Sequence, residues 1–342
     1  MRTFYQYSFF IALLIIVRIG FSQDIQFSQF YQAQLYQNPA FAGSLHEARL
    51  SSHNRIQWPS IDAKYVTNYL SYDTYLRKYR SGFGGYLIYD RQSRGNVQSY
   101  ELAGQYSYEL HLTNFISFRY GLQVGLGSKT LDYLQINFPE QYDDFQGLVG
   151  ANPFQNNPRK VYADISSGGV LYTTNWWLGL SAHHINTPNQ TFLNLKAPLP
   201  TKFALTAGYR FVLRQNIAGT AHEEELPNQI SITPTFHLKS QGRSDQFDVG
   251  LYGQYYQGIV GVWYRGIPIK TMGNFQNNES IVALVGYRFY NLSLTYSYDF
   301  IISSLTRANP FGAHELNLTY FFSTKRFTKP TKKVPCPQYY RY

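Results

Sequence analysis

The chain has 342 residues, of which 44% are hydrophobic, 15% are charged and 18% are aromatic, chiefly 32 Tyr and 25 Phe. So many aromatic residues can bury enough apolar area to exclude a disordered chain, and the negative mean hydropathy disfavours a helical membrane protein. The formal net charge of +10 would suit a nucleic-acid partner only if the charge were clustered on the folded body.

The first 22 residues have the pattern of a secretory signal peptide. Arg2 precedes an apolar run from Phe9 to Val17, and Gly20-Phe21-Ser22 provides small residues before Gln23. This run is shorter than the roughly 20 apolar residues that a spanning helix needs. We therefore predict that residues 1–22 are a signal peptide and that the mature protein is exported. An uncleaved amphipathic anchor is the alternative, because Arg18 interrupts the apolar flank.

Much of the positive charge lies outside the predicted folded body. The last twenty residues, 323–342, hold six basic residues and no acid, whereas the body from Gln23 to Phe322 holds 22 basic and 20 acidic residues. A nucleic-acid partner is therefore not expected. We predict instead a basic periplasmic tail that contacts the cell wall, a periplasmic complex or acidic lipid headgroups. The candidate contact residues are Lys332, Lys333 and Cys336, the single cysteine, which cannot form an internal disulfide.

From Ala48 to Phe322 apolar and polar residues alternate with a period of two. Leu292, Leu294 and Tyr296, for example, alternate with Ser293, Thr295 and Ser297. Each run covers about nine to thirteen residues, the length that a tilted strand needs to cross a bilayer. We therefore predict an all-β fold, a transmembrane antiparallel β-barrel of about fourteen strands over residues 48–322. A soluble β-rich extracellular protein is the alternative. The predicted strands are 48–58, 65–76, 81–91, 98–110, 115–129, 161–173, 175–186, 202–213, 228–239, 245–256, 258–267, 279–290, 292–300 and 313–322.

The connections between these strands fall into two classes. An even number of strands places both chain ends on the periplasmic side, where outer-membrane barrels have short turns, and longer loops then face outward. The predicted tight links are 77–80, 111–114, 174, 257 and 291, with 214–227 as a longer exception, and the predicted outer loops are 130–160, 187–201, 268–278 and 301–312. This asymmetry favours a transmembrane barrel over a soluble propeller.

A lumen of fourteen strands is wider than side chains alone fill. Residues 23–47 are too apolar to remain in solution, and we predict that they pack at the periplasmic mouth or inside the lumen. The candidate plug residues are Phe27, Phe30, Tyr31, Asn38, Pro39 and Phe41. The alternation also predicts lumen-facing arginines, which either form a polar network with Asp73, Asp90, Glu101 and Glu109 or contact a partner: Arg119, Arg210, Arg265 and Arg288.

Motifs for catalysis are weak. Gly121 to Thr130 superficially suggests a phosphate loop, but Ser128 separates the last glycine from Lys129. His183 and His184 are expected on one strand, pointing to opposite faces, so they could not share a metal without another element. No spacing selects an acid–base group from Asp90, Asp299 and His314. Neither an enzyme nor a cofactor is expected.

Several segments resemble one known family. The mature start, from Asp24 to Gly43, resembles the opening motif of the PorP/SprF family of outer-membrane proteins of Bacteroidota, and matching segments recur along the mature chain. They are Arg55–Pro59, Ser71–Asp73, Phe138–Gln141, Leu178–Asn189, Val262–Pro268 and His314–Leu318. Glu140 stands where an Asp is expected, a departure that keeps the carboxylate.

The resemblance implies an outer-membrane barrel associated with the type IX secretion system. Members of this family support the secretion or surface attachment of cargo proteins that carry a C-terminal sorting domain; some serve gliding motility and others the core apparatus. The implied partners are such a cargo protein, periplasmic secretion-system or cell-wall components, and outer-membrane lipid. A channel or transporter for small or hydrophobic solutes is the alternative, because the barrel alone would equally permit it.

Overall fold

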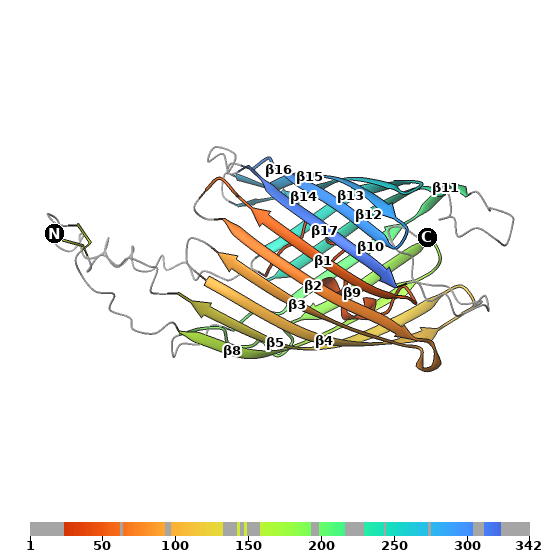
Figure 1. The fold of residues 1–342 in the computed structure, drawn as a ribbon, viewed down its shortest axis with the longest axis horizontal. Helices are drawn as coiled ribbons and strands as arrows, with labels where there is room; N and C mark the ends of the chain where they lie inside the picture. The colour runs from red at the N-terminus through yellow and green to blue at the C-terminus, as the bar shows by residue number, and fades with distance from the viewer. Residues whose placement is uncertain are drawn as a thin grey trace, which may run out of the picture.

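The computed structural model describes residues 24–61, 64–92, 97–132, 142–143, 147–148, 158–192, 198–215, 229–242, 244–272, 275–303 and 311–322. Fourteen of the described strands form one closed antiparallel ring (Figure 1). They are β1 (Ala48–Gln57), β2 (Tyr65–Leu76), β3 (Ser81–Gln92), β4 (Val97–His111), β5 (Ser117–Leu131), β8 (Arg159–Tyr172), β9 (Trp176–His183), β10 (Lys202–Tyr209), β12 (Gln229–Gln241), β13 (Ser244–Tyr255), β14 (Gly258–Met272), β15 (Phe275–Phe289), β16 (Leu292–Ile301) and β17 (Ala313–Phe322). The predicted all-β barrel is therefore confirmed.

Pairing of β1 with β17, and of β10 with both β9 and β12, closes the ring. The first strand lies beside the last, with Ala48 opposite Phe322, and β10 bridges β9 and β12. A short strand, β11 (Phe211–Gln215), pairs with β12 outside the ring, and a separate hairpin joins β6 (Tyr142–Asp143) to β7 (Gly147–Leu148). A closed ring leaves its fourteen members no unpaired edge, which is what strands in a bilayer require.

The period-two pattern separates the two faces of the wall. On β17 the side chains of Glu315, Asn317 and Thr319 point inward and are at most 1% exposed, while Leu316 and Leu318 point outward and are 43% exposed. The same alternation runs along β4, β5 and β16. The outer face is therefore apolar and the inner face polar, the reverse of a soluble barrel.

The two ends of the barrel differ. One end, the tight-turn end, carries the connections at 112–116, 173–175, 256–257 and 290–291 and the 3-10 helix η2 (Arg77–Tyr79). The opposite end, the long-loop end, carries most of the longer connections. The predicted outer loop 268–278 is wrong, because β14 continues to Met272 and β15 begins at Phe275. The predicted strand 202–213 is divided at Arg210 into β10 and β11. The pairing of β9 ends at Tyr209 of β10, so β11 does not pair with β9.

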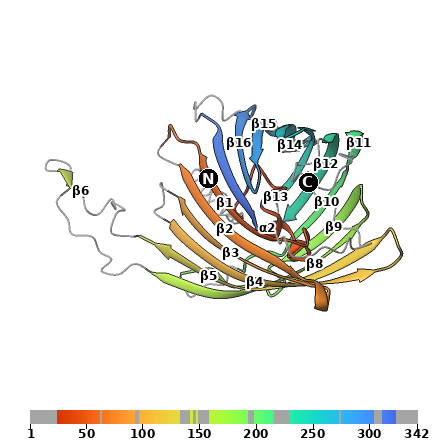
Figure 2. The same ribbon diagram turned by 45° about the vertical axis from the view of Figure 1, so that its right-hand side comes forward.

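Residues 24–47 lie inside the ring, and we call them the luminal segment. The segment contains one α-helical turn, α2 (Gln34–Gln37), and one 3-10 turn, η1 (Pro39–Phe41). Figure 2 shows α2 enclosed by the strands of the wall. Within the described residues, no helix is long and apolar enough to cross a membrane.

Candidate functional site: the occupied lumen

The luminal segment begins near the long-loop end of the barrel. The Asp24 carboxylate lies 2.7 Å from His184 Nε2, accepts a hydrogen bond from Lys202 Nζ at 2.7 Å and accepts another from Gln241 Nε2 at 3.0 Å. His184 Nδ1 lies 2.7 Å from a carboxylate oxygen of Asp164. The start of the segment is thus tied to β8, to the end of β9, and to β10 and β12.

The charges of this cluster support one another. Burial by itself would lower the pKa of His184, but the carboxylates of Asp24 and Asp164 raise it to about 9. Burial by itself would raise the pKa of Asp24, but Lys202 and His184 hold it well below its usual range. At neutral pH a protonated imidazole therefore bridges two carboxylates.

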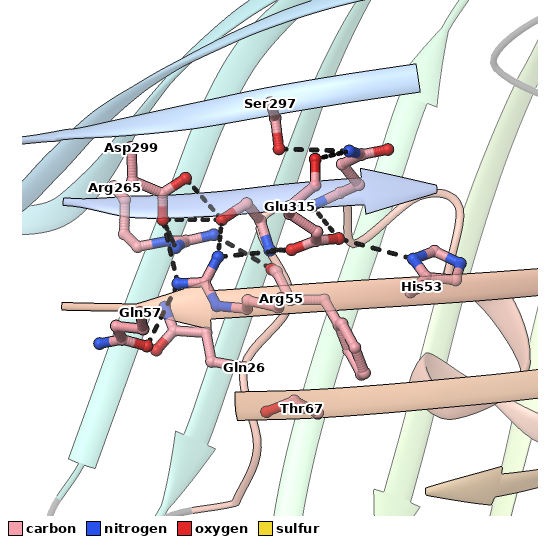
Figure 3. Close-up of polar contacts among 12 residues, drawn as sticks. Gln26, His53, Arg55, Gln57, Thr67, Arg265, Ser297, Asp299 and Glu315 are labelled. Carbon is pink, nitrogen blue, oxygen red and sulfur yellow. Dashed lines mark hydrogen bonds and ion pairs between the residues drawn. The ribbon is translucent and has the colours of Figure 1, made fainter. Parts of the chain in front are cut away.

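A second cluster lies deeper in the lumen, where the segment passes β1, β16 and β17 (Figure 3). The backbone N–H groups of Ser28 and Gln29 donate to the Glu315 carboxylate at 2.6 and 3.1 Å. The Ser28 hydroxyl donates to Asp299 at 2.6 Å. Arg55 donates to Ser28, to Asp299 at 3.0 Å and to Glu315 at 3.3 Å, so this arginine contacts both carboxylates and the segment.

Arg265 extends the cluster on its other side. Its guanidinium donates to Asp248 at 2.9 Å, to Asp299 at 3.3 Å and to the Phe27 carbonyl at 3.2 Å. The cluster therefore holds two guanidinium groups against three carboxylates, and the N–H groups of the luminal segment supply further donors. Without the segment, Glu315, which is fully buried, would lose two charge-assisted hydrogen bonds.

Aromatic side chains of the segment fill the space between these polar clusters. Phe30 stacks on His237 with ring centroids 5.2 Å apart, and Tyr31 meets Tyr252 edge-on at 4.3 Å. Phe27 meets Tyr69 edge-on at 5.4 Å. Phe27, Phe30, Tyr31 and Phe41 are all at most 5% exposed, so the lumen contains a hydrophobic core of its own.

Glycines in the wall let the backbone of the segment approach closely. A Cβ atom added at Gly121 would lie 2.2 Å from the Ala40 nitrogen, and one at Gly82 would lie 2.0 Å from the Ala42 carbonyl oxygen. Asn38 begins η1 by accepting from Ala40 N–H at 2.9 Å, and its amide donates to the carbonyls of Gly169 and Leu180 at 3.2 and 3.0 Å. Pro39 is the first residue of η1, where its missing N–H costs no hydrogen bond.

The segment leaves the lumen at the tight-turn end. Arg119 donates to the Ala42 carbonyl at 2.8 Å and to Glu109 at 3.0 Å. Glu109 also accepts from Tyr75 at 2.5 Å and lies 3.0 Å from His46 Nε2. Burial lowers the pKa of His46 although its hydrogen bond to Glu109 opposes this. The luminal segment is therefore fastened at both ends of the barrel and in the middle.

The structure places the four arginines selected from the sequence at separate positions. Arg119 and Arg265 lie in the clusters described above. Arg210 and Arg288 are also buried, but near the tight-turn end, where they donate to the carbonyls of Thr174 and Tyr290 at 2.9 and 2.6 Å. Of the acids proposed as counterparts, Glu109 pairs with Arg119, while Asp73 pairs with Arg49. Lys332, Lys333, Cys336 and the segments 1–22 and 138–141 lie outside the described residues.

The structure differs from the sequence-based expectation for His183 and His184. His183 and His184 do not point to opposite faces, because β9 ends at His183 and His184 has a left-handed φ of 57°. Both imidazoles are buried, and His183 Nε2 lies 2.8 Å from the Gln37 carbonyl oxygen. His314 bonds Tyr296 in an exposed position, whereas Asp299 lies in the lumen, so they form no acid–base pair. Among the described residues, no group of three or more His, Cys, Asp or Glu could hold a metal ion.

Sequence reasoning missed Asp24, Ser28, Asp299 and Glu315 as central residues of the lumen. The sequence did contain one indication. Asp299 and Glu315 stand at the positions of their alternating strands that carry polar residues, and they are the only acidic or basic residues, histidine aside, in those two strands. The alternation predicts that these side chains point inward. Which inward carboxylates contact the luminal segment depends on where that segment lies.

A closed antiparallel barrel with an apolar outer face and a polar lumen defines an outer-membrane β-barrel protein, whose short turns face the periplasm. The chain belongs to the family described as type IX secretion system membrane protein PorP/SprF, whose model matches residues 19–320. It is thus a secretion-system barrel of the outer membrane. No curated protein matches it in sequence.

Solved structures that are similar to this chain are also β-barrels, but their sequence identity to it is low. Omp33 of Acinetobacter baumannii has 8% identity and a TM-score of 0.45, over 82% of this chain and 100% of that one. A FadL homologue of Pseudomonas aeruginosa has 12% identity and a TM-score of 0.41, over 85% and 94%. The toluene transporter TodX of Pseudomonas putida has 12% identity and a TM-score of 0.40, over 88% and 94%. Identities this low give no information about what this chain binds.

Proposed function

We propose that this protein is a non-enzymatic barrel that supports the secretion or surface attachment of one specific cargo protein carrying a C-terminal sorting domain. Membership of the family supports a role with secretion-system components and cargo. The observation that carries the proposal is the occupied lumen: residues 24–47 contact the wall from the long-loop end to the tight-turn end. A barrel closed in this way suits docking better than diffusion of solutes.

The buried clusters support a structural role for two of the arginines. Arg119 and Arg265 each bond a carbonyl oxygen of the luminal segment and a carboxylate of the wall. We therefore propose that they keep the lumen closed rather than contact cargo. The cargo and the periplasmic partners would then meet the rims, and the basic tail with Lys332, Lys333 and Cys336 is the proposed periplasmic contact.

Deletion of the gene tests the cargo role. One surface protein with a sorting domain should become unattached or degraded while other cargo is exported normally, as measured by surface labelling and by proteomics of the medium. Complementation with the wild-type gene is the control. Loss of all export would indicate a core role in the apparatus, and unchanged attachment of every cargo would contradict the proposal.

Conductance separates docking from transport. The purified barrel in a planar bilayer should show no steady, large open pore, because the luminal segment fills its path. A steady pore of large conductance in the intact protein would favour the alternative, a channel or transporter for small or hydrophobic solutes.

A further inference from the structure

A cavity of about 320 Å³ lies in the outer part of the lumen, between the start of the luminal segment and the walls β1, β2 and β3. Its volume is at the lower end of the range for small-molecule sites. We call it the Trp58 pocket. Gln26, Arg55, Gln57, Trp58, Thr67 and Gln92 are among the residues that line it. Figure 3 shows Gln26, Arg55 and Gln57 close together, with Thr67 on the neighbouring strand.

The lining disfavours an apolar ligand. It presents three amide side chains, those of Gln26, Gln57 and Gln92, together with carboxylate, guanidinium and hydroxyl groups. Within the protein, Gln26 donates to Glu279 at 3.3 Å and Gln57 accepts from Arg55 at 3.3 Å, and a ligand would add to these bonds. An apolar ligand would remove these groups from water without replacing their hydrogen bonds, which costs free energy for each group.

The charges of the pocket are already compensated, which disfavours a charged ligand. Arg55 is paired with Asp299 and Glu315, and Asp24 is paired with His184 and Lys202. Asp90 accepts a hydrogen bond from Thr67 at 2.6 Å. A ligand ion would have to compete with these internal partners.

The aromatic pair at the mouth adds a flat apolar surface. Trp58 is half-buried and meets Tyr65 edge-on, with ring centroids 5.5 Å apart. Trp58 has a φ of 57°, a left-handed conformation that bulky residues seldom adopt, and its N–H donates to the Gly312 carbonyl at 2.8 Å. Such strain is often found where a side chain is held for binding.

We propose that the Trp58 pocket binds a neutral polyhydroxylated ligand, a sugar unit, that enters from the outer side of the membrane. A sugar has closely spaced hydroxyl groups that donate and accept, matching amides that do both, and a C–H face that packs on an indole ring. The site is separate from the cargo role proposed above and does not depend on it.

Saturation-transfer NMR on the full-length protein in detergent tests the proposal. The neutral probes are glucose, galactose, mannose and N-acetylglucosamine, each as the monosaccharide and as a short oligosaccharide. Glucosamine and glucuronate are the cationic and anionic probes. At least one neutral sugar should bind, and at least tenfold more tightly than the charged probes. Preference for the oligosaccharide would identify a polymeric glycan as the source, and equal binding would identify a free sugar.

Three variants locate the binding. Trp58→Ala and Gln92→Ala should each weaken binding at least tenfold, whereas Trp176→Ala, at the tight-turn end, should not change it. Heat-modifiable electrophoretic mobility shows whether each variant folds, and Trp58→Phe replaces Trp58→Ala if the latter does not. The proposal is overturned if no neutral sugar binds, if glucosamine or glucuronate binds as tightly as the best neutral sugar or more tightly, or if folded Trp58 and Gln92 variants bind like the wild type.

Discussion

The close approach of the luminal segment to β5 can be tested by adding a single methyl group to the wall. In Gly121→Ala the new Cβ would lie 2.2 Å from the Ala40 nitrogen and 2.3 Å from the Pro39 carbonyl carbon. Ordinary contacts begin near 3.4 Å, so the backbone at Ala40 must move away by about 1 Å. A shift of this size would also strain the hydrogen bonds that the Ala42 carbonyl accepts from Ser107 and Arg119 at 2.7 and 2.8 Å.

The expected cost is that of overpacking a buried site, about 1–3 kcal/mol. Because the strand keeps its own pairing and outward side chains, this cost should fall mainly on the seating of the luminal segment. A change of 1–3 kcal/mol corresponds to a roughly 5- to 150-fold rise in the population with the segment displaced.

Hydrogen exchange of the amides of residues 40–42 measures this population, and single-channel recording shows whether displacement opens a pore. The matched control is Gly104→Ala on the neighbouring strand β4, where an added Cβ meets no atom within 4 Å. Faster exchange and more frequent openings are expected in Gly121→Ala alone. If both variants exchange and conduct like the wild type, the close contact with Gly121 does not hold the segment in place.

Three further predictions concern the buried charges and the tail. Arg55→Met leaves Asp299 and Glu315 short of a buried partner and should lower the free energy of unfolding by about 3–5 kcal/mol in urea titrations. The exposed Arg91→Met is the control, and equal losses would contradict the role of the cluster. The pKa of His184 is raised to about 9, so its stabilisation is full below the unfolded value near 6.5 and is lost as pH rises through about 9. The difference in Tm between the wild type and His184→Gln should accordingly shrink between pH 7 and pH 10, and a constant difference would contradict this assignment. Removal of residues 323–342 should weaken co-purification of periplasmic partners without changing the Tm of the barrel, and unchanged co-purification would count against a contact by the tail.

Alternation, the length of the alternating runs and the asymmetry of the connections together predicted the barrel. A period of two determines which side chains of a strand share a face, and the length of the runs indicated that the strands cross a bilayer. The breaks at Arg77–Tyr79 and at 290–291 were equally visible, because polar or turn-forming residues interrupt the pattern there. Where polar residues continue the strand, as from Gln276 to Asn278, the pattern failed and a loop was predicted instead.

The contents of the lumen were decided by the tertiary structure. The sequence of residues 24–47 showed a segment too apolar for solvent, but not that Ser28 and Gln29 would meet Glu315 across 287 and 286 positions of chain. Such pairings depend on ring closure between β1 and β17, a long-range event that no local pattern encodes.

The sequence by itself therefore determined the wall of the barrel. Its strands, its two faces and its placement in a membrane follow from the local periodicity and the length of the runs. Only the tertiary structure decided how the luminal segment packs inside the barrel. Wall glycines such as Gly121, the break after His183 and the carboxylate pairs acquire their meaning only when distant strands converge around one segment.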